Sequence, residues 1–125
     1  MKINAFEEIQ SWQKAQDLAV FIYQFFGNIK DFSFKDQICR AAVSISNNIA
    51  EGFDRDTDRE FIRFLMIARA SNNEVKSMLY LAKRLNYIDE EKFKEGIDLF
   101  IHIGRLINKF ITYLKTTKSI DNKKD

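Results

Sequence analysis

The sequence contains no proline, four glycines, one cysteine and one histidine among its 125 residues. Sandwiches and barrels of β-strands need turn residues roughly every 8–12 positions, so this shortage argues against an all-β fold. A lone cysteine excludes a disulfide framework and any site built from several cysteines. No hydrophobic run approaches the roughly 20 residues of a membrane span, and the opening MKINAFEEIQSWQKAQ lacks the apolar stretch of a secretion signal. We therefore expect a cytoplasmic, helical protein.

Hydrophobic residues make up 46% of the chain and charged residues 30%, which is typical of a globular domain. The net charge is only +2, and it is unevenly distributed. Residues 1–54 carry five basic and seven acidic side chains, a net −2, whereas residues 55–125 carry fifteen and eleven, a net +4. Charge alone therefore does not indicate a nucleic-acid-binding protein, but its basic excess is C-terminal.

Hydrophobic periodicity predicts four amphipathic helices joined by short loops. Such helices pack most simply as an antiparallel, up-down-up-down four-helix bundle in an all-α fold. We expect the bundle to span residues 1–116, with a flexible basic tail over 117–125 and with helices at about 6–27, 33–53, 58–86 and 90–115.

Capping residues support these boundaries. Ser33 is a plausible N-cap of the second helix, and Thr57 with Glu60 forms a capping-box pattern before the third. Asn86 fits the left-handed position that ends the third helix, and Asp89 fits the N-cap of the fourth.

The third helix is apolar over most of its circumference. Its core stripe is expected to contain Phe61, Leu65, Ala68, Asn72, Val75 and Leu79. Further apolar residues fall on one flank (Ile62, Met66, Tyr80) and on the other (Ile67, Met78, Leu81, Leu85). We predict a homo-oligomer interface through Ile62, Met66 and Tyr80; an irregular monomer surface is the alternative. The first helix is simpler, with an expected core face of Ile9, Trp12, Ala15, Ala19, Tyr23 and Phe26.

A polar stripe follows the second helix at three- and four-residue steps: Gln37, Arg40, Ser44, Asn47, Asn48 and Glu51. Small residues on the other side predict close approach by another helix. An antiparallel hairpin centred near Arg55 would bring Arg40 within reach of Ser71 or Glu74, and Glu51 within reach of Arg59. The alternative is that the stripe faces solvent.

Residues that could carry catalysis or bind a metal are few. His102 lacks the Glu-x-x-His spacing of bundle metal sites, because Leu99 stands three residues before it, and it shares its face with charged residues. Cys39 has no second cysteine beside it and is expected to be a small buried hydrophobe. The four glycines form no phosphate-binding loop. We expect no enzyme activity, no metal and no cofactor.

Basic residues gather in two places. Arg55, Arg59 and Arg63 follow four-residue steps, and Arg105, Lys109, Lys115, Lys118, Lys123 and Lys124 accumulate towards the C-terminus. Repeated around an oligomer, such residues could bind several phosphates with little sequence selectivity. The alternative is an ordinary solvated face, since Asp54, Asp56 and Asp58 offset the charge.

The segment RAAVSISNNIAEGF, residues 40–53, resembles the signature of the four-helix-bundle proteins encoded in intervening sequences of bacterial 23S ribosomal RNA genes. FEEIQSWQKAQDLAVFIY and FLMIARASNNEVKSMLYLAKRLNYI resemble the first and third helices of that family. The resemblance spans roughly residues 6–114. Ser46 is a departure, since many members carry proline there; serine restores a backbone donor and predicts a straighter helix.

This resemblance implies an antiparallel four-helix bundle that assembles as a ring-like homopentamer, with no attached enzyme activity. The related accessory proteins of diversity-generating retroelements bind nucleic acid and partner a reverse transcriptase. Two functional hypotheses remain: an oligomeric module that binds RNA or DNA, and a structural or protein-interaction scaffold without nucleic acid. An enzyme is a distant third, which a deep pocket with convergent ionisable groups would favour.

Overall fold

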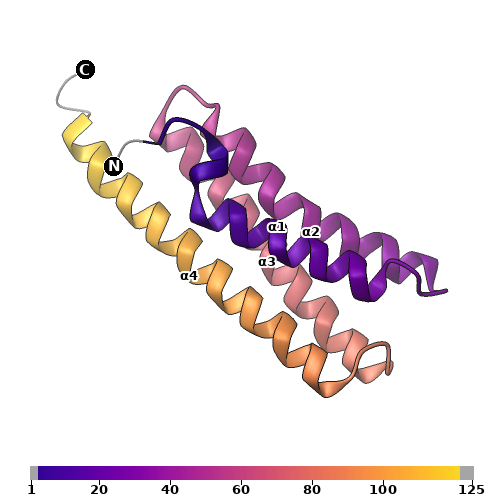
Figure 1. The fold of residues 1–125 in the computed structure, drawn as a ribbon. Helices are drawn as coiled ribbons and strands as arrows, with labels where there is room; N and C mark the ends of the chain where they lie inside the picture. The colour runs from indigo at the N-terminus through magenta and orange to yellow at the C-terminus, as the bar shows by residue number, and fades with distance from the viewer. Residues whose placement is uncertain (1–2, 122–125) are drawn as a thin grey trace.

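The computed structural model describes residues 3–121 of the chain, and the side chains of residues 3–116. A single 3-10 turn, η1 (Phe6–Glu8), precedes four α-helices: α1 (Gln10–Phe26), α2 (Phe32–Phe53), α3 (Asp58–Arg84) and α4 (Glu90–Asp121). No strand occurs among residues 3–121. The helices pack side by side in a bundle, and α4 extends beyond α1 at one end (Figure 1). The all-α four-helix bundle predicted from the sequence is confirmed.

Consecutive helices run in opposite directions (Figure 1). Their side-chain contacts agree with this order, because the end of one helix meets the start of the next (Phe26 with Phe34, Lys83 with Glu90) while residues farther from the turn meet residues farther along the next helix (Gln16 with Ser46, Ser44 with Ser71, Arg69 with Asn108). Each helix packs against two others, with α1 and α3 both lying between α2 and α4. This arrangement places one end of every helix beside the turn that joins α2 to α3.

Side-chain caps begin three of the helices. The side chains of Asp31, Thr57 and Asp89 accept hydrogen bonds from the backbone N–H three residues later, at 3.1, 3.2 and 2.8 Å. Asn86 ends α3 with a φ of 61°, the left-handed conformation predicted for it. The prediction of Ser33 as the cap of α2 is wrong. The Asp31 carboxylate, held also by the Tyr87 hydroxyl at 2.7 Å, starts that helix two residues earlier.

The first helix does not begin at residue 6 as predicted. The chain forms the 3-10 turn η1, becomes extended at Ile9 (φ −77°, ψ 121°) and enters α1 at Gln10. Ile9 is 3% exposed, so its burial holds the extended residue against the bundle. The Phe6 ring packs edge-on against Trp12 at 5.3 Å and fixes η1 on the start of α1.

The last helix is longer than predicted. It continues to Asp121 instead of ending near residue 115, so part of the predicted tail is helical. No glycine or proline follows Gly104 to stop it, and the Thr116 hydroxyl donates to the Thr112 carbonyl one turn earlier at 2.9 Å. The Lys118 side chain, together with Lys123 and Lys124, lies outside the described residues.

All four helices contribute to one hydrophobic core. Its fully buried large side chains include Leu18, Ile22, Phe26, Ile38, Ile45, Ile49, Leu65, Leu79, Ile103 and Ile107. All six residues of the predicted α3 core stripe are buried. Among the described residues, no helix combines the length and apolar character that crossing a membrane requires.

The core face of α1 differs from the predicted one. The buried residues are Ser11, Ala15, Leu18, Phe21, Ile22 and Phe26, whereas Tyr23 is 53% exposed and Trp12 and Ala19 are half-buried. Six consecutive apolar residues, from Leu18 to Tyr23, mask the periodicity in this segment. Tyr23 is therefore a surface residue.

Candidate interaction surfaces

A polar seam lies between α2 and α3. The Ser44 and Ser71 hydroxyls are 2.9 Å apart, and the Asn48 amide donates to the Ser44 carbonyl at 2.8 Å and to its hydroxyl at 2.9 Å. These three side chains are half-buried. Gln37 extends the seam by donating to the Glu74 carboxylate at 3.4 Å. The inner members of the polar stripe thus link the two helices within one chain.

The outer members of that stripe face solvent. Arg40 does not reach Ser71 or Glu74; it pairs with Asp36 one turn earlier on α2, at 2.9 Å, and its side chain is 79% exposed. Glu51 is also exposed, and no contact joins it to Arg59 among the described residues. The predicted contacts of Arg40 with Ser71 or Glu74, and of Glu51 with Arg59, are therefore wrong.

The small residues of α2 face neighbours in the same chain. Ser46 is buried, and its hydroxyl accepts from the Gln16 amide of α1 at 2.9 Å. Cys39 is also buried. Gly52 approaches α3, where a Cβ would lie 2.7 Å from Phe64 Cβ. The close approach predicted for this helix is thus present inside the bundle.

Within residues 3–116, the predicted basic residues are exposed, and those near the α2–α3 turn are mixed with acids. The α2–α3 turn and the last part of α4 meet at one end of the bundle around a cleft that includes Arg55, Asp56, Asp58, Tyr113 and Leu114. Arg105 lies nearer the middle of the bundle, because Gly104 beside it lies near Asn72 of α3. Two of the cations already have in-chain contacts: Arg55 lies 4.7 Å from the Phe64 ring centre, and Arg63 lies 3.6 Å from Glu60. Arg59, Arg105, Lys109 and Lys115 are exposed and have no ion-pair partner among the described residues.

Helix α3 exposes large apolar side chains after its core stripe is buried. Met66, Ile67, Tyr80, Leu81 and Leu85 are each 43–50% exposed. Ile62, predicted to lie in an interface, is only 8% exposed because it packs into the core of its own chain. Met66 and Tyr80 remain on the flank next to α4, where the Tyr80 ring also packs edge-on against Phe93 at 5.0 Å.

A second apolar surface, which the sequence reasoning missed, lies between α1 and α2. Val20 and Tyr23 of α1 are 66% and 53% exposed and line a shallow groove with Val43 of α2. The sequence did not reveal this surface because the predicted core face of α1 was rotated about the helix axis and placed Tyr23 in the core.

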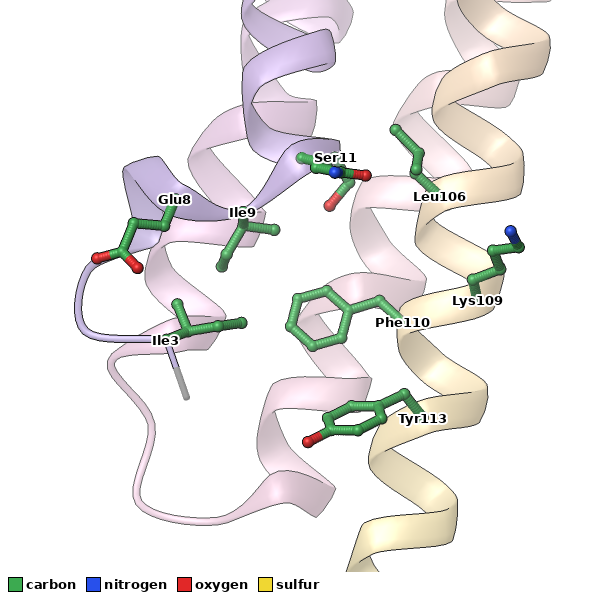
Figure 2. A pocket seen from close by; sticks show the side chains of 9 residues that line it. Ile3, Glu8, Ile9, Ser11, Leu106, Lys109, Phe110 and Tyr113 are labelled. Atoms are coloured by element: carbon green, nitrogen blue, oxygen red, sulfur yellow. The ribbon is translucent and has the colours of Figure 1, made fainter. Parts of the chain in front are cut away.

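A cleft opens where α1 begins, between its first residues and the second half of α4 (Figure 2). It measures about 500 Å³ and is lined mainly by apolar side chains: Ile3, Ile9, Leu106, Phe110 and Tyr113. Ser11 also lines it and is 2% exposed, and its hydroxyl has no hydrogen-bond partner among the described residues. Sequence patterns gave no signal for this cleft, because it arises where the short α1 meets the long α4.

The two residues with catalytic potential are placed as expected. His102 is exposed on α4. Cys39 is buried, and burial, the largest cause, raises the pKa of its thiol, as does Asp36, while Lys35 lowers it. A thiol in this environment stays protonated at neutral pH. Within the part of the chain that the structure describes, no three His, Cys, Asp or Glu side chains gather closely enough to hold a metal ion.

Comparisons with known proteins agree with this bundle. A comparison with curated proteins gives no match. Among solved structures, the chain is similar to the crystal structure of a protein of unknown function from the S23 ribosomal protein family of Bacteroides thetaiotaomicron. The two share 30% identity and a TM-score of 0.75, over 81% of this chain and 97% of that chain. Residues 7–109, from η1 into the second half of α4, match the family described as 23S rRNA-intervening sequence protein, and the chain belongs to that family.

Proposed function

We propose that the protein is a non-enzymatic, homo-oligomeric interaction module. The observation that supports this most directly is the exposure of large apolar side chains on α3 after the bundle has formed: Met66 and Tyr80, on the flank next to α4, are 46% and 50% exposed. Exposed apolar side chains that share one helix flank are typical of protein–protein contacts. A second copy of the chain supplies the partner by closed symmetry, in which one patch meets its equivalent or a complementary patch.

We place the interface on the flank of α3 that faces α4. Met66 and Tyr80 lie on this flank, and Ile101 of the adjoining helix α4 is 40% exposed. Phe100, the neighbour of Ile101, accepts a hydrogen bond from the Asn72 amide through its carbonyl at 3.0 Å, so this part of α4 is held against α3. The surface is therefore built on two rigid helices rather than on a loop.

Light scattering after size-exclusion chromatography tests the proposal. The family resemblance implies five copies, with a mass of 5 × 14.8 kDa, or 74 kDa. Met66→Glu or Tyr80→Glu should shift the mass towards the monomer while circular dichroism keeps its helical signal. Val20→Glu is the matched control, since it makes the same change at an exposed position of α1. A monomeric unmodified chain at micromolar concentration would refute the proposal.

Nucleic acid is the second candidate partner. The supporting observation is the set of exposed cations without in-chain ion pairs: Arg59, Arg105, Lys109 and Lys115. Five copies of a +2 chain would carry +10, and their repeated cations could neutralise several phosphates and release counterions. Asp54, Asp56 and Asp58 lie in the same turn region and oppose this, so we expect binding that weakens steeply with salt.

A salt titration against RNA and DNA of equal length separates this candidate from a scaffold. The double variant Arg59→Glu and Arg63→Glu should weaken binding to all sequences alike. Arg84→Glu controls for a single charge reversal of the same kind at the other end of α3. If neither nucleic acid is retained at roughly 50 mM salt, the protein acts as a scaffold without nucleic acid.

A further inference from the structure

The cleft at the start of α1 has the shape of a small-molecule site. Ile3, Ile9, Phe110 and Tyr113 surround it from the N-terminal segment and from α4, leaving an opening beneath the first turn of α1 (Figure 2). Its volume of about 500 Å³ falls within the range of pockets that hold small ligands. The residues assigned above to self-association or nucleic acid do not include these apolar side chains, although Tyr113 also lines the neighbouring cleft at the α2–α3 turn.

The inner end of the cleft offers hydrogen-bond donors. The cap position of α1, Ile9, has no side-chain cap, unlike Asp31 of α2 and Thr57 of α3. The first backbone N–H groups of α1, starting at Gln10, therefore have neither an intrahelical acceptor nor a capping side chain. Helix N-termini of this kind attract negatively charged groups, because the backbone dipoles align there.

Ser11 provides the second, independent observation. Its side chain is almost fully buried, with 2% of the residue exposed, and its hydroxyl finds no partner within residues 3–121. Figure 2 shows its side chain turned from α1 towards the space bounded by Ile9 and Phe110. Buried hydroxyls are almost always paired in folded proteins, so an unpaired one at the edge of a cleft indicates a missing acceptor.

The charged residues at the rim do not compete for this position. Glu8 and Lys109 both line the cleft, but their charged ends point away from it on opposite sides (Figure 2). A ligand acceptor group would therefore meet the α1 N-terminus and the Ser11 hydroxyl, while its apolar body meets Ile9 and Phe110.

We propose that this cleft binds an amphipathic monocarboxylate, with its carboxylate at the N-terminus of α1 and the Ser11 hydroxyl, and its hydrocarbon chain among Ile3, Ile9, Leu106 and Phe110. The carboxylate accepts the Ser11 hydrogen bond and the free backbone N–H groups. The hydrocarbon chain covers apolar surface that is open in the single chain. This inference does not depend on self-association.

Isothermal titration with sodium decanoate, octanoate, decanol and decylamine tests the ligand class. Decanoate should bind at least tenfold more tightly than decanol or decylamine, since only the carboxylate is matched by the donors. Each buried methylene contributes about a fourfold gain, so decanoate, with two more methylenes, should bind roughly fifteenfold more tightly than octanoate. Equal binding of decanoate, decanol and decylamine would overturn the proposal, because it would show unspecific apolar adsorption.

Two variants test the site itself. Ser11→Ala should weaken decanoate binding by roughly tenfold or more, whereas the unfolding temperature without ligand should stay equal or rise, because an unpaired hydroxyl has been removed. Leu106→Trp should fill the cleft and abolish binding, whereas His102→Trp, at an exposed position on the same helix, should not. Decanoate affinity unchanged by Ser11→Ala and Leu106→Trp would overturn the proposal.

A second copy of the chain is the competing occupant. Backbone amide NMR shifts of Ile9, Ser11 and Phe110 should move on adding decanoate and should not change with protein concentration in its absence. Shifts that change with protein concentration alone would assign the cleft to self-association and overturn the carboxylate proposal.

Discussion

Replacing Gly52 by alanine should destabilise the bundle, although alanine is the better helix former. A Cβ at this position of α2 would lie 2.7 Å from Phe64 Cβ and 2.8 Å from Phe61 Cδ1. Phe64 Cβ moves only with the α3 backbone, so rotating a side chain cannot relieve the contact and the two helices must separate. Overpacking costs about 1–3 kcal/mol, against a gain of about 0.5–1 kcal/mol from helix propensity. We expect a net loss of about 1–2 kcal/mol.

Gly104→Ala is the matched control in α4. The nearest atom to its Cβ would be the Asn72 amide nitrogen at 3.7 Å, an ordinary contact. This variant should therefore gain about 0.5–1 kcal/mol from propensity alone. Thermal unfolding at one fixed protein concentration measures both effects, because a change of about 1 kcal/mol in the free energy of unfolding shifts the unfolding temperature by roughly 3–5 °C in a domain of this size. If both variants raised the unfolding temperature equally, the close approach of α2 and α3 would be refuted.

Three further predictions concern contacts at the helix ends and on the polar seam. Thr57→Ala removes the cap of α3 and should cost about 1 kcal/mol in urea unfolding; no change would show that the cap is unimportant. The Tyr87 hydroxyl, and then a backbone N–H, lower the pKa of Asp31 below 3.8, so stability should fall as the pH drops below that value. Tyr87→Phe should flatten this acid dependence of the unfolding temperature, and an unchanged pH profile would contradict the role of the hydroxyl. Glu74→Ala removes an exposed contact with Gln37 and should cost less than about 1 kcal/mol; a larger loss would mean that the seam is buried.

The sequence predicted the helices well where local chemistry decides the structure. The Thr57 cap, the left-handed Asn86 and the α3 core stripe depend on residues close together in the chain, and the structure confirms all three. Ser33 was predicted as the cap of α2, but Asp31 caps it through the Phe34 N–H, and its carboxylate is also held by Tyr87 from 56 residues away. The contact with Tyr87 is not contained in the local sequence.

Surfaces were harder to predict than helices because they depend on how each helix is rotated about its axis and on how long it is. In α1, a run of six apolar residues fits several helical faces, so Tyr23 was assigned to the core and the groove beside Val43 was missed. Arg40 was expected to cross to α3, but periodicity places a side chain on a face without choosing among its acceptors. The α1 cleft follows from 17 residues packing beside a helix of 32, a mismatch that appears only once both boundaries are known.

The assembly interface can be located by asking which unusual residues already contact other parts of the same chain. Cys39, Ser46 and Gly52 admit close neighbours, but α1 and α3 of the same chain fill that role, so these residues give no support for an external helix on α2. Met66 is 46% exposed, and Tyr80 is 50% exposed although one edge contacts α4. Nothing in the described chain covers the rest of either side chain. A change from methionine to glutamate at Met66 therefore disturbs little of the folded chain, and a loss of assembly in that variant would identify α3 as the contacting helix.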